Sequence, residues 1–318
     1  MSNPAEPRHD LSGALKSDVD GEAVTRLADA FAAIADERPA TALPLLRQAD
    51  ARGSRMAAAL LRHLAGEGPD HAYAAHAAFQ AFIRGGDNVP LYAAVSQAMA
   101  ERHARPVVHR LLDIGAGDGM ALLPALRAGT RLPDRIDVIE PQDGLRDALA
   151  ALFAEQFAGA HAQGRLQLHG VTLQAFVQGL SQGDHWDLAQ SSFALQSLPP
   201  PERVDALRAL RPHVDTLVVV EFDVPALAHG TPAYFHSVAG RYERCLAQYG
   251  EDAALIALGF LAPMLAGQLR RGVAPSNWEQ PVADWQREFE QAGYQPREAR
   301  PLYDYSWSPA WWMEASAH

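Results

Sequence analysis

Cysteine is nearly absent from this chain of 318 residues, in which Cys245 stands alone. A single thiol excludes an intramolecular disulfide and any metal site built from several cysteines. Lysine is equally scarce, because Lys16 is the exception among 27 basic residues that are otherwise all arginine. That bias, together with abundant alanine, is typical of a GC-rich bacterial genome.

Positive charge is also in deficit, since the formal net charge is −11. An acidic chain is a poor candidate for binding nucleic acid, because affinity for phosphate backbones comes mainly from clustered basic residues. There is no run of 18 or more apolar residues and no basic stretch followed by an apolar core at the start, so we expect neither a membrane span nor a signal peptide. These absences predict a soluble cytoplasmic protein.

Metal-binding patterns are missing as well. The 13 histidines include no H-E-x-x-H pattern, and His71 and His76 are five residues apart, off a common helix face. We predict no metal. Cys245 falls in the middle of an expected helix and is interpreted as a packing residue.

The sequence divides into a flexible tail (1–20), a helical cap region (21–105) and an α/β domain (106–318). In the cap region, apolar residues such as Val24, Leu27 and Phe31 recur three to four apart, as amphipathic helices require. From 107 onward short apolar runs alternate with helical patterns, which predicts a doubly wound, mostly parallel sheet. Seven strands are expected, at 110–114, 135–140, 165–169, 186–190, 216–222, 295–302 and 308–315. A helical insertion at 231–270 precedes the last helix.

The main chemical signal is the run LDIGAGDG at 112–119. Glycines at a strand-to-helix turn allow a ligand to approach the backbone, and the helix start offers free N–H groups. Glu140 ends the next expected strand, 21 residues after Gly119, which suits an acid that binds a ribose diol.

Two cofactor classes fit this geometry. A nicotinamide enzyme favours G-x-G-x-x-G with pyrophosphate on the helix start, but here Met120 replaces the third glycine and Asp118 would repel a second anion. Asp118 suits a ligand with cationic groups, and S-adenosylmethionine (SAM) carries a sulfonium and an ammonium.

LDIGAGDG, then VIEP at 138–141 and WDLAQSSF at 186–193, resemble the class I SAM-dependent methyltransferases over about residues 107–318. The resemblance implies a Rossmann-like fold with a closing β-hairpin, and SAM as the cofactor. It implies a cofactor site formed by Tyr92, Asp113, Gly115, Ala116, Gly117, Asp118, Glu140, Thr172, Leu173, Gln190 and Ser191. Within that set, Asp113 would organise the turn, Glu140 would bind the ribose, and Thr172 and Leu173 would lie by the adenine.

Acceptor chemistry is less defined. A general base is needed only when the nucleophile arrives protonated, and the candidates are Glu221, Asp223 and His236. Candidate substrate-binding residues are Phe193, Arg241, Tyr242 and Trp307, with Tyr303, Tyr305 and Trp307 expected to alternate on one strand face. Each also fits a plain packing or surface role.

The sequence therefore predicts a methyltransferase that acts on an oxygen, a nitrogen or a carbon atom of a small-molecule acceptor. The helical additions resemble a lid over an enclosed pocket, although a homodimer interface is the other interpretation. Two other functions stay open. One is a SAM-fold binding or regulatory protein without methyl transfer, and the other is a nicotinamide-dependent oxidoreductase.

Overall fold

The computed structural model describes residues 20–67, 72–269 and 277–318. The expected tail therefore lies outside the described residues except for Asp20, which accepts a hydrogen bond from the Glu22 N–H at the start of the first helix. His71 and residue 270, the last of the expected insertion, also lie outside them.

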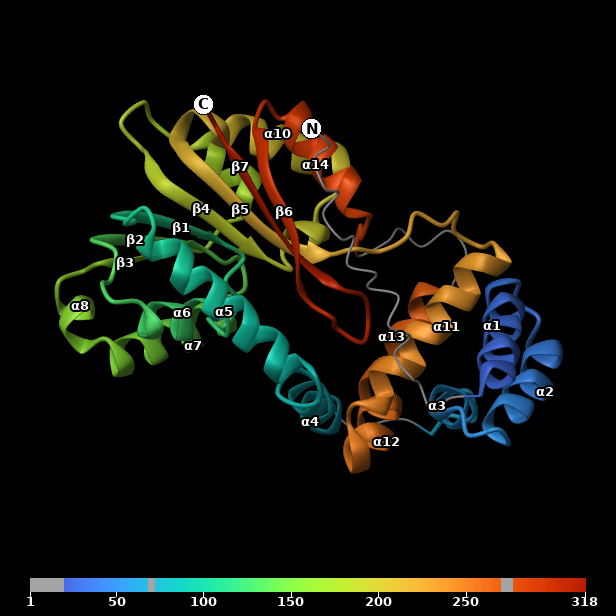
Figure 1. Ribbon diagram of the computed structural model, residues 1–318. Coiled ribbons are helices and arrows are strands. Elements are labelled where there is room, and N and C mark those ends of the chain that lie inside the picture. The colour runs from blue at the N-terminus through green and yellow to red at the C-terminus, as the bar shows by residue number, and fades with distance from the viewer. Residues whose placement is uncertain (1–19, 68–71, 270–276) are drawn as a thin grey trace, which may run out of the picture.

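One seven-stranded sheet organises the α/β domain (Figure 1), with strand order β3-β2-β1-β4-β5-β7-β6. Strands β1 to β5 are parallel, whereas β7 pairs antiparallel with both β5 and β6. This confirms the predicted doubly wound, mostly parallel fold. The strands are β1 (Arg110–Ile114), β2 (Arg135–Ile139), β3 (Leu166–His169), β4 (Trp186–Ser192), β5 (Val214–Phe222), β6 (Gln295–Tyr303) and β7 (Ala310–Ser316).

Helices cover both faces of the sheet, as parallel strands with two buried faces require. One face packs against α5 (Asn88–Ala104), α6 (Leu122–Ala128), α7 (Asp143–Gln156) and α8 (Ala158–Ala162). The other face packs against α9 (Leu173–Gln178), α10 (Pro200–Leu210) and α14 (Val282–Gln291). Two short 3-10 turns, η1 (Leu195–Ser197) and η2 (Arg211–His213), flank α10.

The remaining helices form a second lobe with its own core. It combines α1 (Gly21–Ala35), α2 (Pro39–Asp50) and α3 (Arg55–Leu64) with α11 (Pro232–Ala247), η3 (Gly250–Asp252), α12 (Ala253–Ile256), the π-helical η4 (Ala257–Leu261) and α13 (Ala262–Gln268). Figure 1 shows this lobe beside the sheet, joined to it by α4 (Ala72–Ile83) and α5.

The helices of the expected cap region (21–105) divide between the sheet and the helical lobe. Of the N-terminal helices, α5 packs on the sheet through Leu91, Val95 and Met99, whereas α1 and α3 pack against the insertion. The reason is that the apolar stripes of α1 and α11 pack together, with Val24, Leu27 and Phe31 of α1 in one core with Val238, Tyr242 and Leu246 of α11.

One helical run, Gly250–Gln268, is long and apolar enough to cross a membrane by length and composition. Its Ile256, Leu261 and Leu265 are buried in the core of the helical lobe. Phe260 of the same run contacts Phe79 and Phe82 of α4. About 33% of the run is buried within the protein.

Candidate functional site

The glycine turn follows β1 at the carboxyl edge of the sheet. The chain leaves β1 toward β2 on one side and leaves β4 toward β5 on the other. In open α/β sheets, ligands bind at such a switch point. The turn thus lies where a cofactor site is expected.

Backbone geometry explains two of the glycines in this turn. Gly115 has φ +72°, and a Cβ there would lie 2.4 Å from the Ala194 Cβ. Gly117 has φ +58°, yet a Cβ there would meet nothing within 4 Å. Gly115 is therefore required by packing, whereas Gly117 leaves open space over a left-handed backbone that other residues rarely adopt.

Glu140 directly follows β2 and is 5% exposed. Its Oε2 accepts a hydrogen bond from the Gly117 N–H (3.0 Å) and its Oε1 accepts one from the Gln142 N–H (2.9 Å). An ionised carboxylate has about four acceptor positions, so two remain for a ligand. The predicted ribose-binding acid also braces the glycine turn.

Asp118 lies in the same turn and forms an ion pair with Arg84 at the end of α4 (3.1 Å). The Asp118 side chain is 20% exposed and that of Arg84 is 59% exposed. Arg84 was not among the residues predicted from the sequence. This pair connects the helical segment before β1 to the predicted cofactor turn.

Asp113 is buried on β1 beside Gln190 of β4. The Gln190 Nε2 donates to Asp113 Oδ2 (2.6 Å), and the Gln190 Oε1 lies 2.8 Å from His103 Nε2. Burial raises the pKa of Asp113 to about 7, and burial lowers the pKa of His103. Gln190 was expected to end its strand, but β4 continues to Ser192. His103 was missed by sequence reasoning.

Four further predicted cofactor residues have structural contacts. Ser191 Oγ donates to the Ile114 carbonyl (3.0 Å). Thr172 caps α9 by accepting from the Ala175 N–H, and Leu173, the first residue of that helix, is buried. Ala116 is partly buried and packs against the core on the α5–α8 face of the sheet. Their contact with a cofactor stays a prediction.

Aromatic rings form a continuous row at this edge. Tyr92 meets Phe193 edge-on (5.9 Å between ring centroids), Phe193 stacks on Phe222 (4.5 Å), and Phe222 stacks on Tyr305 (5.3 Å). Phe193 adopts φ +56°, a strained conformation that non-glycine residues adopt mainly where the surroundings enforce it. Burial raises the pKa of Tyr92 to about 12, and the charges of Asp118 and Glu221 add to this. Tyr92 and Phe193 therefore adjoin the glycine turn.

The two predicted catalytic carboxylates already accept hydrogen bonds from backbone N–H groups. Glu221 is 1% exposed, its Oε1 accepts from the Gln196 N–H (3.1 Å), and burial raises its pKa to about 8. Asp223 Oδ1 accepts from the Val282 N–H at the start of α14 (2.9 Å). Both carboxyl groups secure local structure at the end of β5.

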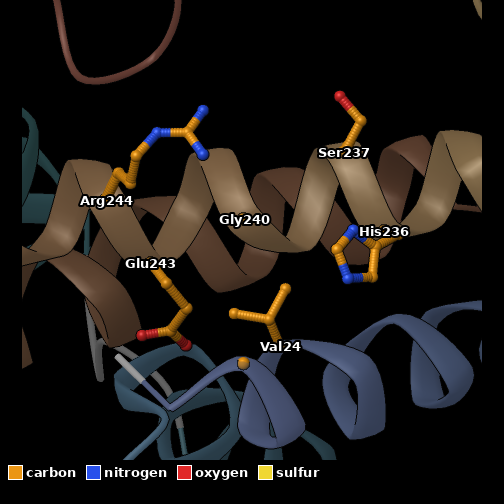
Figure 2. A pocket seen from close by; sticks show the side chains of 7 residues that line it. Val24, His236, Ser237, Gly240, Glu243 and Arg244 are labelled. Carbon is orange, nitrogen blue, oxygen red and sulfur yellow. The ribbon is translucent and has the colours of Figure 1, made fainter. Parts of the chain in front are cut away.

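His236 lies in a pocket between α1 and α11 that Val24 and Gly240 also line. Figure 2 shows its ring on the side of α11 that faces α1. It is exposed there, among residues of the helical lobe rather than beside the glycine turn. The structure does not bring it together with Glu221 and Asp223.

The predicted substrate residues Arg241, Tyr242 and Trp307 form one cluster with Glu279. Arg241 pairs with Glu279 (3.1 Å) and lies 4.4 Å over the Trp307 ring. The Trp307 Nε1 donates to Glu279, and Tyr242 meets Trp307 edge-on. This cluster joins α11 to the β6–β7 connection.

The expected alternation of Tyr303, Tyr305 and Trp307 on one strand face is wrong. β6 ends at Tyr303 and β7 begins at Ala310, so the other two aromatics lie on the connecting loop. That loop sends Tyr305 into the row of rings and Trp307 toward the helical lobe.

Among the described residues, no group of three or more His, Cys, Asp or Glu side chains is placed to hold a metal ion. Cys245 is buried, and burial raises its thiol pKa to about 12. A thiol in that environment is not a reactive nucleophile at neutral pH.

Neither a protein-family model nor a curated protein matches the chain. It is similar to the solved structure of magnesium protoporphyrin IX methyltransferase (ChlM) from Synechocystis PCC 6803, with 15% identity and a TM-score of 0.47 over 72% of this chain and 84% of that one. It is also similar to an O-methyltransferase family protein from Burkholderia thailandensis, with 13% identity and a TM-score of 0.46 over 72% and 55% of the two chains. For the mitomycin 7-O-methyltransferase MmcR the values are 14%, 0.45, 72% and 54%. The alignment thus spans about half the length of the last two proteins.

Proposed function

We propose that this protein is a SAM-dependent methyltransferase that acts on an oxygen, a nitrogen or a carbon atom of a small-molecule acceptor. The observation that carries the proposal is the open, left-handed Gly117 beside Glu140 at the switch point of the sheet. The placement of antiparallel β7 between β5 and β6 supports the same family resemblance that the motifs indicate.

The residues of the turn fit this cofactor. Glu140 retains acceptor positions for a ribose diol, and Asp118 offers a negative charge to a cationic methionyl end. The open space at Gly117 admits close approach to the backbone. Bound SAM would supply a methyl group that its sulfonium already activates, so the protein mainly has to hold donor and acceptor in line.

Proton removal is a smaller part of the proposed mechanism. Glu221 and Asp223 each accept a backbone hydrogen bond, and His236 lies in the helical lobe. These placements favour acceleration by orientation over abstraction by one of these three groups. Tyr92, Phe193 and Arg241 remain proposed contacts of the cofactor or the acceptor.

The proposal includes a soluble, cytoplasmic enzyme of bacterial origin that does not bind nucleic acid. The acidic net charge supports it, as does the packing of Ile256, Leu261 and Leu265 from the apolar Gly250–Gln268 run in the core of the helical lobe. A homodimer is also proposed, as the alternative in which the helical additions form an interface between two copies instead of a lid. The other candidate functions are a SAM-fold binding protein and a nicotinamide-dependent oxidoreductase, and titration separates them from a methyltransferase.

The test is calorimetric titration of the wild-type chain and two valine variants with SAM, S-adenosylhomocysteine (SAH) and NAD. Gly117→Val should abolish binding of SAM and SAH, because the side chain fills the space that the cofactor needs. Gly164→Val is the matched control, because Gly164 also has positive φ (+65°) and open surroundings but lies before β3.

Binding of NAD instead of SAM would refute the proposal. So would unchanged SAM affinity in folded Gly117→Val. SAM that binds but is never consumed over a broad panel of acceptors would favour the binding protein.

A further inference from the structure

A hydrogen-bonded chain of buried polar side chains runs from His103 near the end of α5 to Asp113, two residues before Gly115. His103 is 6% exposed, Gln190 is 1% exposed and Asp113 is 2% exposed. The two contacts that connect them are 2.8 Å and 2.6 Å long. Buried polar groups with defined partners are oriented by those partners, because an unpaired buried group is costly.

The direction of this chain follows from the chemistry of its ends. A carboxylate only accepts hydrogen bonds, so the Gln190 amide must turn its NH₂ toward Asp113. Its carbonyl oxygen then faces His103, which must carry a hydrogen on Nε2. With Asp113 protonated, the amide can reverse and accept from the carboxylic acid, and His103 then needs its hydrogen on Nδ1. The chain therefore has two arrangements, which differ in the charge of Asp113.

We propose that His103 is a positioning residue for the glycine turn, because its Nε2–H fixes the Gln190 amide in the arrangement that keeps Asp113 a carboxylate. This inference rests on the proposed function, because a negative Asp113 would add to the negative charge that Asp118 offers to the cationic methionyl end of SAM. His103 itself lies behind Gln190 and acts only through it.

The neighbouring charged residues do not stabilise a negative Asp113, so that role falls to the hydrogen bond from His103 through Gln190. Glu140 on the neighbouring β2 side opposes a negative Asp113. Arg102 adjoins His103, but it is paired with Glu314 of β7 (3.0 Å) and disfavours a protonated imidazole. His103 is therefore neutral, and its tautomer decides which way the amide points.

The first experiment is nitrogen-15 NMR of the histidine rings of the full chain, with and without His103→Gln for assignment. We expect the Nε2–H tautomer at pH 8, and a shift toward Nδ1–H as the pH falls through about 7 and Asp113 becomes protonated. An Nδ1–H tautomer at pH 8 would overturn the proposal. This readout does not depend on SAM.

The second experiment measures SAH affinity from pH 6 to 8.5. In the wild-type chain the affinity should rise with pH through about 7, because the carboxylate is the binding form. His103→Leu should weaken SAH binding about tenfold at pH 7, because Gln190 is then no longer held with its NH₂ toward Asp113. A factor of ten corresponds to about 1.4 kcal/mol. Its midpoint should move to higher pH, and His103→Gln, whose amide N–H occupies the place of Nε2–H, should restore the wild-type profile.

Ser96→Ala is the matched control. Ser96 is also buried on α5, where its Oγ donates to the Ala121 carbonyl (3.0 Å), but it makes no hydrogen bond to His103, Gln190 or Asp113. If His103→Leu and Ser96→Ala lower the melting temperature alike and both keep the wild-type pH profile, His103 is a packing residue and the proposal is wrong. Failure of the wild-type protein to bind SAH would overturn the proposed function instead. The His103 tautomer would still test the proposed arrangement of the His103, Gln190 and Asp113 hydrogen bonds.

Discussion

Glu140 combines two tasks in one side chain. It holds the Gly117 and Gln142 N–H groups and still faces the space where a ribose is expected. Its removal therefore withdraws a ligand contact and also frees two backbone donors.

Glu140→Ala should weaken SAM binding by about 1.5–3 kcal/mol, the range for hydrogen bonds to a charged group. Glu140→Gln should lose less, because its amide oxygen can still accept from one of the two N–H groups. Calorimetry with SAM and with 5′-methylthioadenosine, which keeps the ribose but lacks the amino acid, measures both variants. Equal losses for the two ligands support ribose binding, and unchanged affinity for either contradicts it.

Local patterns in the sequence were sufficient to place the glycine turn and Glu140, because strand, turn and acid follow one another within a short segment. They were not sufficient for His103 or Arg84. Their partners, Gln190 and Asp118, lie 87 and 34 residues away, and no periodicity records such a contact. Arg84 carries one weak signal, since it directly precedes Gly85 and Gly86, where the chain turns toward α5.

Among the elements, strands were predicted within about two residues, because each is a short apolar run between polar turns. Helix starts were predicted less closely than strand bounds. The helix that follows the glycine turn begins only at Leu122, since the positive φ of Gly119 (+86°) delays it. Packing between α1 and α11 was not predictable, because the apolar stripe of each helix does not indicate which other helix it contacts.

The end of β5 offers a prediction about pH. The unfolded chain should titrate Glu221 near 4.5, whereas burial raises its pKa to about 8 in the folded chain. The stabilisation by the neutral form is therefore complete below about pH 4.5 and is lost as pH rises through 8. Glu221→Gln keeps an oxygen for the Gln196 N–H and does not ionise.

Urea unfolding at pH 5 and pH 8 measures this effect. Relative to the wild-type chain, Glu221→Gln should gain about 2–4 kcal/mol between the two pH values, since one pKa unit corresponds to about 1.4 kcal/mol. Glu290→Gln, on the exposed face of α14, should change little. Parallel pH curves for Glu221→Gln and the wild-type chain would rule out a buried, neutral Glu221.

At the scale of the whole molecule, two lobes meet at the α4–α5 junction (Figure 1). Asn88 donates to the Tyr249 hydroxyl (2.8 Å) and accepts from the Tyr305 hydroxyl (3.0 Å). The Tyr249 hydroxyl in turn donates to the Phe82 carbonyl (3.0 Å). One asparagine thus connects the helical lobe, α4 and the β6–β7 loop.

This junction predicts how cofactor binding reaches the helical lobe. Ligand at the glycine turn should order Asp118, and Asp118 holds Arg84 at the end of α4. Hydrogen exchange of the wild-type chain should therefore show that SAH protects the turn and also residues 81–92 and 236–249. Protection confined to the turn and Glu140 would contradict a lid. Protection of the helical blocks that follows protein concentration rather than SAH would indicate a dimer interface.

Arg84→Gln tests the connection itself. The variant should keep SAH-dependent protection of the glycine turn but lose most of it in 236–249, because the ion pair that spans the lobes is gone. Arg62→Gln is the matched control, since Arg62 forms a similar exposed pair with Glu67 (2.9 Å) within the described part of the helical lobe, away from the turn. An exposed pair contributes only about 0–1 kcal/mol to stability, so both variants should fold alike. If Arg84→Gln retains protection throughout the lobe, the coupling runs through Asn88 and the aromatic row instead of through Asp118.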